Sequence, residues 1–283
     1  MKGRGIQPSG AVVLVTGASS GIGRAIAMAF GKAGARVAVA ARRFDLLNET
    51  AAAIDDCLVI PTDLADESAA IAMVDRTVEH FGRIDVLINN AALIIVSRAD
   101  EVSSDELMQS FRTNVVGPIA ATNRALRYMR KQGRGHVINI GSPGFLIGIP
   151  LYTPYVCSKA AMSGWTRTIQ AEWEGTGIMV SEYFPGYVAT GSPAVSRYGA
   201  VAQDAIIEPE RKGISTLFIR PKTPEQVARQ IVHLVQRPRY IAYSSRIAAF
   251  GAWIANLSGR RVAIASDMAR AVRKRLGLSV FSD

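Results

Sequence analysis

The sequence AVVLVTGASSGIGRAIAMAF at residues 11–30 joins an apolar run, a glycine-rich turn and a helical pattern. The run at residues 11–15 is rich in β-branched side chains, which is typical of a strand buried on both faces. Gly17, Gly21 and Gly23 follow at once, and the pattern of residues 22–30 predicts a helix. A strand, a glycine-rich turn and a helix in direct succession indicate a phosphate-binding βα unit.

Each glycine of this turn has an expected role. In such units the first glycine permits the tight turn, the second lets the backbone approach a pyrophosphate, and the third lets the helix pack closely. The helix N-terminus supplies free amides and a positive dipole end to the phosphates. The spacing here is G-x-x-x-G-x-G, not the commoner G-x-G-x-x-G. We therefore expect a dinucleotide to contact this turn, at Gly17, Ser19, Ser20, Gly21, Ile22 and Gly23.

A second motif places Tyr155 and Lys159 four positions apart, with Ser142 thirteen positions before the tyrosine. Residues i and i+4 share one face of a helix, so the phenol and the ammonium are expected to point into one site. A cation beside a phenol favours the phenolate and lowers a pKa that is otherwise about 10. The motif therefore predicts a tyrosine that acts as a general acid or base near neutral pH.

Together with the glycine turn, this motif resembles the short-chain dehydrogenase/reductase family over roughly residues 10–243. Two departures from the family pattern are visible: Ala92 replaces a glycine, and Pro143 follows Ser142 where a small flexible residue is more usual. Neither residue carries a reacting group. Three further segments match family elements in chain order: Asn89-Asn90-Ala91-Ala92, the helix asparagine Asn114, and Pro185-Gly186 with Thr190.

The resemblance implies a hydride-transfer enzyme. Ser142 would bind the substrate oxygen, and Tyr155 would donate or accept the proton. Lys159 would lower the pKa of Tyr155 and hold the cofactor ribose, while Asn114 would position a water that links Lys159 to solvent. A cofactor-binding regulatory protein with little turnover remains an alternative, although the intact Ser142, Tyr155 and Lys159 argue against it.

The end of the second expected strand indicates which nicotinamide cofactor binds. Ala41 stands where NAD-dependent enzymes of this type usually carry an acid for the ribose 2′-hydroxyl. Arg42 and Arg43 follow, and an arginine fork suits a 2′-phosphate. We therefore expect NADP(H). The resemblance also implies cofactor contacts at Asp63, Leu64, Asn90, Ala91, Tyr155, Lys159, Pro185, Gly186, Val188 and Thr190.

Strand and helix patterns alternate along the chain, which predicts an α/β fold with a Rossmann-type doubly wound parallel sheet. Thr223-Pro224-Glu225 has the cap, proline and acid of a late helix start. Expected strands lie at residues 11–15, 37–41, 58–60, 85–89, 136–140 and 178–183, and expected helices at 22–30, 67–81, 104–115, 118–131 and 155–174. We expect one catalytic domain at residues 10–245, after a basic tail at 1–9 and before a helical extension at 246–283.

Composition excludes several other classes of protein. No run of 18 apolar residues is present, and the basic N-terminus lacks the apolar core of a secretory signal. Two cysteines, Cys57 and Cys157, do not suggest a disulfide framework, so we expect a cytoplasmic protein. The three histidines lack metal-ligand spacing, and no metal is expected. Nucleic-acid binding explains the formal charge of +10 poorly, because the charge is concentrated near the C-terminus.

Apolar residues dominate the segments that wall the site in the family. They predict a hydrophobic ketone or secondary alcohol as substrate. Reduction of 3-oxoacyl groups on a carrier protein ranks lower, because residues 172–177 lack the basic residue that would receive an acidic carrier. The expected wall consists of Ile94, Ile95, Phe145, Leu146, Ile147, Leu151, Tyr152, Val195, Tyr198, Ile206, Ile207, Leu217 and Phe218.

The extension at residues 246–283 carries an apolar stripe and then a basic cluster. Residues 246–275 hold seven Lys or Arg and one Asp. Packing on the body or a second subunit, and peripheral membrane contact through an in-plane helix, both fit this pattern. The resemblance implies a homodimer or homotetramer, and Trp165 and Trp173 lie on a helix that meets its counterpart in that family. Glu182, in an expected core strand, has no assigned role.

Overall fold

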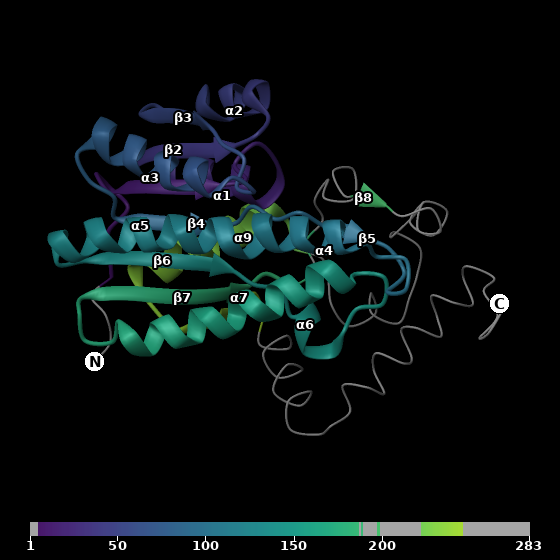
Figure 1. The fold of residues 1–283 in the computed structure, drawn as a ribbon. Coiled ribbons are helices and arrows are strands. Elements are labelled where there is room, and N and C mark those ends of the chain that lie inside the picture. Colours follow the sequence, from purple (N-terminus) through teal and green to yellow (C-terminus); the bar gives the residue numbers. More distant parts are fainter. Residues whose placement is uncertain (1–4, 187, 189–196, 199–221, 246–283) are drawn as a thin grey trace.

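Seven parallel strands form one sheet in the order β3-β2-β1-β4-β6-β7-β9 (Figure 1). The computed structural model describes residues 5–186, 188, 197–198 and 222–245. The strand order reverses direction at β1 and β4, which is the arrangement of a doubly wound sheet. The strands are β1 (Val12–Thr16), β2 (Arg36–Ala41), β3 (Cys57–Pro61), β4 (Val86–Asn89), β6 (Gly135–Ile140), β7 (Ile178–Phe184) and β9 (Ile241–Tyr243).

Helices cover both faces of the sheet, and each layer has its own hydrophobic core. Figure 1 shows α3 (Glu67–Phe81), α5 (Gly117–Gln132) and α7 (Thr153–Glu172) side by side on the near face. One apolar cluster joins these helices to the sheet, and Trp165 and Trp173 are partly buried against it. The second cluster joins α1 (Gly21–Lys32) and α9 (Pro224–Gln236) to the other face. The expected α/β doubly wound fold is confirmed.

Local sequence signals explain where several helices begin. The Asp66 side chain caps α3 by accepting from the amides of Ser68 and Ala69. Thr223 and Gln226 form a capping box at the start of α9, with Pro224 in the first turn. The helix start expected at residues 223–225 is therefore found.

The helix that carries Asn114 differs from its prediction. Two helices were expected, at residues 104–115 and 118–131, with a break before Pro118. Instead, α4 (Ser104–Phe111) continues through a π-helical turn, η1 (Arg112–Val116), directly into α5. Pro118 lies in the first turn of α5, so it does not interrupt the helical path. A π-helical turn inside a longer helix often lies at a functional site.

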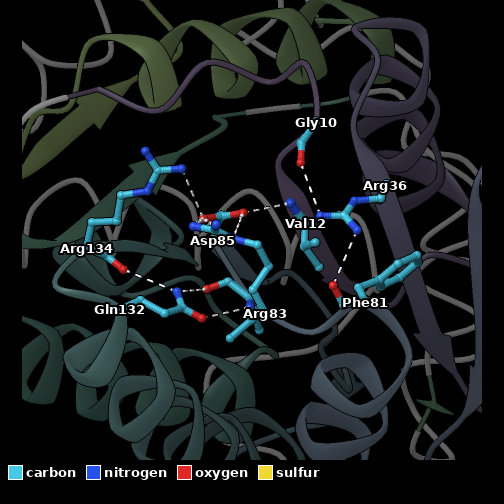
Figure 2. A network of polar contacts seen from close by, with 9 residues as sticks. Gly10, Val12, Arg36, Phe81, Arg83, Asp85, Gln132 and Arg134 are labelled. Carbon is cyan, nitrogen blue, oxygen red and sulfur yellow. Dashed lines mark hydrogen bonds and ion pairs between the residues drawn. The ribbon is translucent and has the colours of Figure 1, made fainter.

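A polar network fixes the ends of the strands that lie opposite the glycine turn (Figure 2). The Asp85 carboxylate, 1% exposed, accepts a 3.0 Å hydrogen bond from the amide of Val12. Arg83 binds the same carboxylate with Nε at 3.0 Å and Nη2 at 2.6 Å, and Arg134 reaches it at 3.4 Å. Gln132 bonds both the amide and the carbonyl of Ile84. These contacts hold the starts of β1 and β4 together.

Five short elements lie outside the sequence predictions. α2 (Phe44–Ala51) follows β2, and α6 (Gly144–Ile147) precedes α7. β5 (Ile95–Val96) and β8 (Arg197–Tyr198) pair as a separate two-stranded sheet, while β9 completes the main sheet. Within the described part of the chain, no helix combines the length and apolarity needed to cross a bilayer.

Candidate active site

In the glycine turn between β1 and α1, side chains would be strained or would clash with neighbouring atoms. Gly17 has a φ of 68° and Gly21 has a φ of 55°, both in the left-handed region that glycine adopts without strain. A Cβ on Gly17 would lie 2.8 Å from Ala91 Cα, and a Cβ on Gly23 would lie 2.3 Å from the Gly17 carbonyl oxygen. The turn therefore needs glycine for conformation at Gly17 and Gly21 and for space at Gly17 and Gly23.

The N-terminus of α1 is suited to an anion. Its N-cap, Ser20, has an extended backbone and makes no side-chain capping hydrogen bond, and the first turn carries no acid. The first amides of the helix are therefore free of a side-chain cap and face the positive end of the helix dipole. Arg43 adds a positive charge beside this point, because its Nη2 donates to Ser19 Oγ at 2.9 Å and to Ser20 Oγ at 2.7 Å.

Thr16 holds the end of β4 against the glycine turn. Its Oγ1 accepts from the amides of Asn90 at 3.0 Å and Ala91 at 3.1 Å and donates to the Ile88 carbonyl at 3.2 Å. Asn90 Nδ2 donates back to the Thr16 carbonyl at 2.9 Å. This reciprocal contact places Asn90 and Ala91 beside Gly17. The sequence reasoning did not identify the part played by Thr16.

The predicted reacting groups meet where β6 and α7 approach each other. Tyr155 and Lys159 lie on α7, and Lys159 Nζ is 5.8 Å from the centre of the Tyr155 ring. Ser142 follows β6 closely and forms a side-chain hydrogen bond with Tyr155. Ser142 Oγ also accepts from the amide of Gly144 at 3.2 Å. The structure thus brings Ser142, Tyr155 and Lys159 together, as the spacing predicted.

Protonation of this group differs from the prediction. Burial raises the pKa of the Tyr155 phenol, and the hydrogen bond with Ser142 opposes that rise only in part. Lys159 Nζ donates to the Ile140 carbonyl at 2.8 Å instead of to the phenol. The pKa of Tyr155 is therefore raised where a lowered pKa was expected, and the lowering effect of Lys159 on it stays a prediction. Burial also lowers the pKa of Lys159 to about 8, against the charge of Glu182, which raises it.

Asn114 lies in η1, and its side chain binds neighbouring elements. Asn114 Oδ1 accepts from the Leu93 amide at 2.7 Å, while Nδ2 donates to the Leu93 carbonyl at 2.9 Å and to Ser158 Oγ at 2.9 Å. The amide therefore fastens the segment after β4 to α7. Pro118 has no amide hydrogen, so the Asn114 carbonyl lacks the partner that an α-helix would give it.

A pocket of about 290 Å³ joins the phosphate turn to the reacting groups. Gly23, Asn114, Ser142, Gly186 and Val188 do not line it. Thr190 lies outside the described residues. The predicted residues that line the pocket are Gly17, Ser19, Ser20, Gly21, Ile22, Arg42, Arg43, Asp63, Leu64, Asn90, Ala91, Tyr155, Lys159 and Pro185.

Several lining residues were missed by the sequence reasoning. Thr62 follows β3, Ile140 ends β6, and Gly141 comes next. Ligands of doubly wound sheets bind outside the carboxyl ends of the strands, so strand ends were the signal that pointed to these residues. Thr113, from η1, also lines the pocket, and no local pattern marks it.

The structure describes only part of the expected apolar wall. Ile94 lines the pocket, but Ile95 is fully buried in β5 and Leu146 is 6% exposed, so neither offers a free surface. Val195, Ile206, Ile207, Leu217 and Phe218 lie outside the described residues. Among the residues that the structure describes, no group of His, Cys, Asp and Glu side chains is arranged to hold a metal ion.

A doubly wound sheet, a glycine turn at a helix N-terminus and a tyrosine–lysine pair in one pocket define a Rossmann-type oxidoreductase. The chain belongs to the short chain dehydrogenase family, whose sequence pattern matches residues 11–197. It is 32% identical over 232 residues to the ketoacyl reductase HetN of Nostoc sp., covering 81% of this chain and 76% of that one.

Solved structures agree with this assignment. A short-chain dehydrogenase from Streptomyces avermitilis superposes with a TM-score of 0.77 at 28% identity, covering 95% of this chain and 99% of the other. An alcohol dehydrogenase from Thermococcus sibiricus, complexed with 5-hydroxy-NADP, superposes with a TM-score of 0.68 at 25% identity, covering 82% and 94%. The expected family is confirmed.

Proposed function

We propose that this chain is an NADP(H)-dependent oxidoreductase that interconverts a hydrophobic ketone and a secondary alcohol, with Tyr155 as the proton donor and acceptor. The observation that carries the proposal is the convergence of Ser142, Tyr155 and Lys159 beside a pocket that continues to the glycine turn and Arg43. When bound, the nicotinamide supplies or accepts the hydride. The protein supplies position, charge and the proton.

Tyr155 is placed to exchange a proton with the substrate oxygen. Because burial raises its pKa, the phenol is protonated at neutral pH, which is the form that reduction of a ketone requires. Oxidation of an alcohol requires the phenolate and is therefore favoured by alkaline pH. Ser142, already hydrogen-bonded to the phenol, is placed to bind the same oxygen and orient it.

Lys159 and Asn114 support this exchange. Lys159 Nζ is held by the Ile140 carbonyl within the pocket, where its charge would favour the phenolate as a proton leaves Tyr155. We also assign to Lys159 the binding of the cofactor ribose. The Asn114 carbonyl, which has no Pro118 amide to bind, would hold the water that connects Lys159 to solvent.

The phosphate end of the pocket fits NADP(H) better than NAD(H). Arg42 and Arg43 both line it at the end of β2, where an acid would be needed to bind a free ribose 2′-hydroxyl. Arg43 lies against Ser19 and Ser20, so a 2′-phosphate there would meet a guanidinium and two hydroxyl groups. Asp63 lines the pocket, and its Oδ1 accepts a 3.0 Å hydrogen bond from the Ala65 amide. We propose Asp63 as the residue that contacts the adenine.

The substrate class is tested by a panel of ketones and alcohols. We expect NADPH oxidation, followed by absorbance, with hydrophobic ketones, and the reverse reaction with the matching secondary alcohols at higher pH. No turnover with any member in either direction, by a chain that binds NADPH, would favour the regulatory alternative.

Reduction of 3-oxoacyl groups is the second candidate, favoured by the similarity to the ketoacyl reductase of Nostoc. The same panel distinguishes it, because a 3-oxoacyl thioester would then exceed simple ketones in kcat/KM. A carrier-bound thioester should bring no further gain, since residues 172–177 lack a basic group for an acidic carrier.

We place the catalytic domain at residues 10–245 and assign residues 246–283 to interaction with a second subunit or an anionic membrane. Their structure lies outside the described residues. Deleting residues 246–283 should leave NADPH binding intact and change either the assembly state or sedimentation with anionic vesicles at low salt. If neither changes, the extension has no such role.

A further inference from the structure

A buried carboxylate lies behind the reacting groups, and the proposed mechanism does not use it. Glu182 belongs to β7 and is only 2% exposed. Its Oε2 accepts a 3.0 Å hydrogen bond from Ser163 Oγ on α7. Its Oε1 lies 3.0 Å from the point where a Cβ on Gly141 would stand. The carboxylate therefore reaches across the end of β6 toward the active site.

Lys159, on α7, reaches the same stretch of β6. Its Nζ donates to the carbonyl of Ile140, the residue that precedes Gly141. Lys159 and Ser163 are four positions apart on α7, so they share the helix face that meets β6 and β7. The ammonium and the carboxylate thus both lie close to the Ile140–Gly141 backbone in a region almost without solvent.

The two charges act on each other. Burial lowers the pKa of Lys159 to about 8, and the charge of Glu182 is the influence that raises it. Burial raises the pKa of Glu182, while Ser163, Arg167 and Lys159 lower it, in decreasing order. Each group therefore stabilises the charged form of the other, as opposite charges in a low-dielectric site do.

The other ionisable groups near Glu182 come from two elements. Arg167, on α7, is exposed, so solvent screens it. Tyr243, on β9, stacks on Phe184, and burial and then the charge of Glu182 raise its pKa. Tyr155 lies beyond Lys159 on the same helix. From β6 the neighbours are Asn139, paired in register with Glu182, and Gly141, and both are uncharged. Among these described neighbours, Lys159 is thus the buried cation whose charged form Glu182 stabilises.

We propose that Glu182 is a positioning residue for Lys159: its carboxylate keeps the ammonium charged and directed at the end of β6 under working conditions. The proposal rests on the function proposed above for Lys159. Without the Glu182 charge, Lys159 would lose its proton at a lower pH. The Tyr155 phenolate would then lack a positive charge beside it.

The test measures the protonation of Lys159 without requiring turnover. Only a neutral amine reacts with acetic anhydride, so the rate of acetylation of the Lys159 peptide, followed by mass spectrometry against pH, reports its charge. For the wild-type chain we expect a midpoint at pH of about 8. Glu182→Gln keeps the shape and the acceptor for Ser163 but removes the charge, and the midpoint should fall by roughly one pH unit or more.

Two further variants separate charge from structure. Glu182→Asp retains a carboxylate and should hold the midpoint above that of Glu182→Gln. Thr166→Val removes a buried hydroxyl from the same helix. That hydroxyl accepts a hydrogen bond from Asn139 and not from a group that binds Glu182, so the midpoint should stay unchanged. A midpoint for a folded Glu182→Gln chain equal to that of the wild type would overturn the proposal, and so would an equal fall in Thr166→Val.

Turnover supplies an independent readout. With a ketone from the panel, the alkaline limb of kcat against pH should move to lower pH in Glu182→Gln by the same amount as the acetylation midpoint. A shifted midpoint in a chain that turns over no substrate would support the role of Glu182 and contradict the proposed reaction. A normal reaction with unshifted profiles would contradict the role of Glu182 alone.

Discussion

Arg43 Nη2 donates a 2.7 Å hydrogen bond to Ser20 Oγ and so joins the end of β2 to the N-terminus of α1. The positive end of the α1 dipole and a guanidinium therefore lie at one point of the pocket. An anion held there interacts with both, and a ribose 2′-phosphate is the part of NADPH that NADH lacks. This relationship is the physical basis for the cofactor preference that we propose.

Arg43→Gln should weaken NADPH binding by roughly ten- to a hundredfold, the usual effect of losing a charge-assisted hydrogen bond. NADH binding should change little, because it has no 2′-phosphate. Arg42→Ala, in the same pocket, should act in the same direction. Titration of cofactor fluorescence with both nucleotides measures the effect. Arg24→Gln is the control, since Arg24 pairs with Glu49 on the surface. Equal losses for NADH and NADPH would contradict the assignment.

Asp85→Ala should destabilise the fold by on the order of 3–5 kcal/mol, because it leaves the Val12 amide and Arg83 without their buried partner. Urea unfolding followed by circular dichroism measures this change. Arg134→Gln removes only the 3.4 Å contact of a side chain that is 56% exposed, so its cost should stay below about 1 kcal/mol. If both substitutions had the same small effect, the network in Figure 2 would not hold the strand starts together.

His136 should make the fold sensitive to acid. Burial lowers the pKa of His136 to about 3, so the folded chain keeps the ring neutral, with Nε2 2.7 Å from Ser181 Oγ. The unfolded chain binds a proton below about pH 6.5, so the stability due to His136 is complete above that pH and falls progressively toward pH 3. Between pH 7 and 5 this loss should amount to about 2 kcal/mol.

Urea unfolding at pH 7 and pH 5 tests this dependence. His136→Gln should lose less stability between the two values than the wild type does, whatever its stability at pH 7. Substitution of the exposed His80 by Gln is the matched control and should retain the wild-type difference. An unchanged difference in His136→Gln would show that His136 does not carry the effect.

The sequence predicted the elements whose signals are local. The glycine spacing fixed the turn at Gly17, Gly21 and Gly23, and the cap at Thr223 marked the start of α9. The four-residue spacing of Tyr155 and Lys159 placed both on one helix face near Ser142. In each case the physical requirement lies within a few consecutive residues, so the pattern could be recognised without the fold.

The remaining features depend on contacts between distant segments. Asp85 was expected inside a strand, but its side chain binds Val12, 73 positions away. The pKa of Tyr155 was expected to fall, but burial by the surrounding chain raises it. The environment of Glu182 became interpretable only when the fold placed it beside Ser163 and Gly141. No local spacing encodes these three relationships.

The central claim is that Tyr155 exchanges the proton during NADPH-dependent carbonyl reduction. The most direct measurement compares the wild type with Tyr155→Phe, using the best ketone from the panel and saturating NADPH. Phenylalanine keeps the ring and removes the hydroxyl, so NADPH binding should persist while kcat falls by about 10²–10⁴. A Tyr155→Phe chain that binds NADPH and turns over at a rate near that of the wild type would contradict the account.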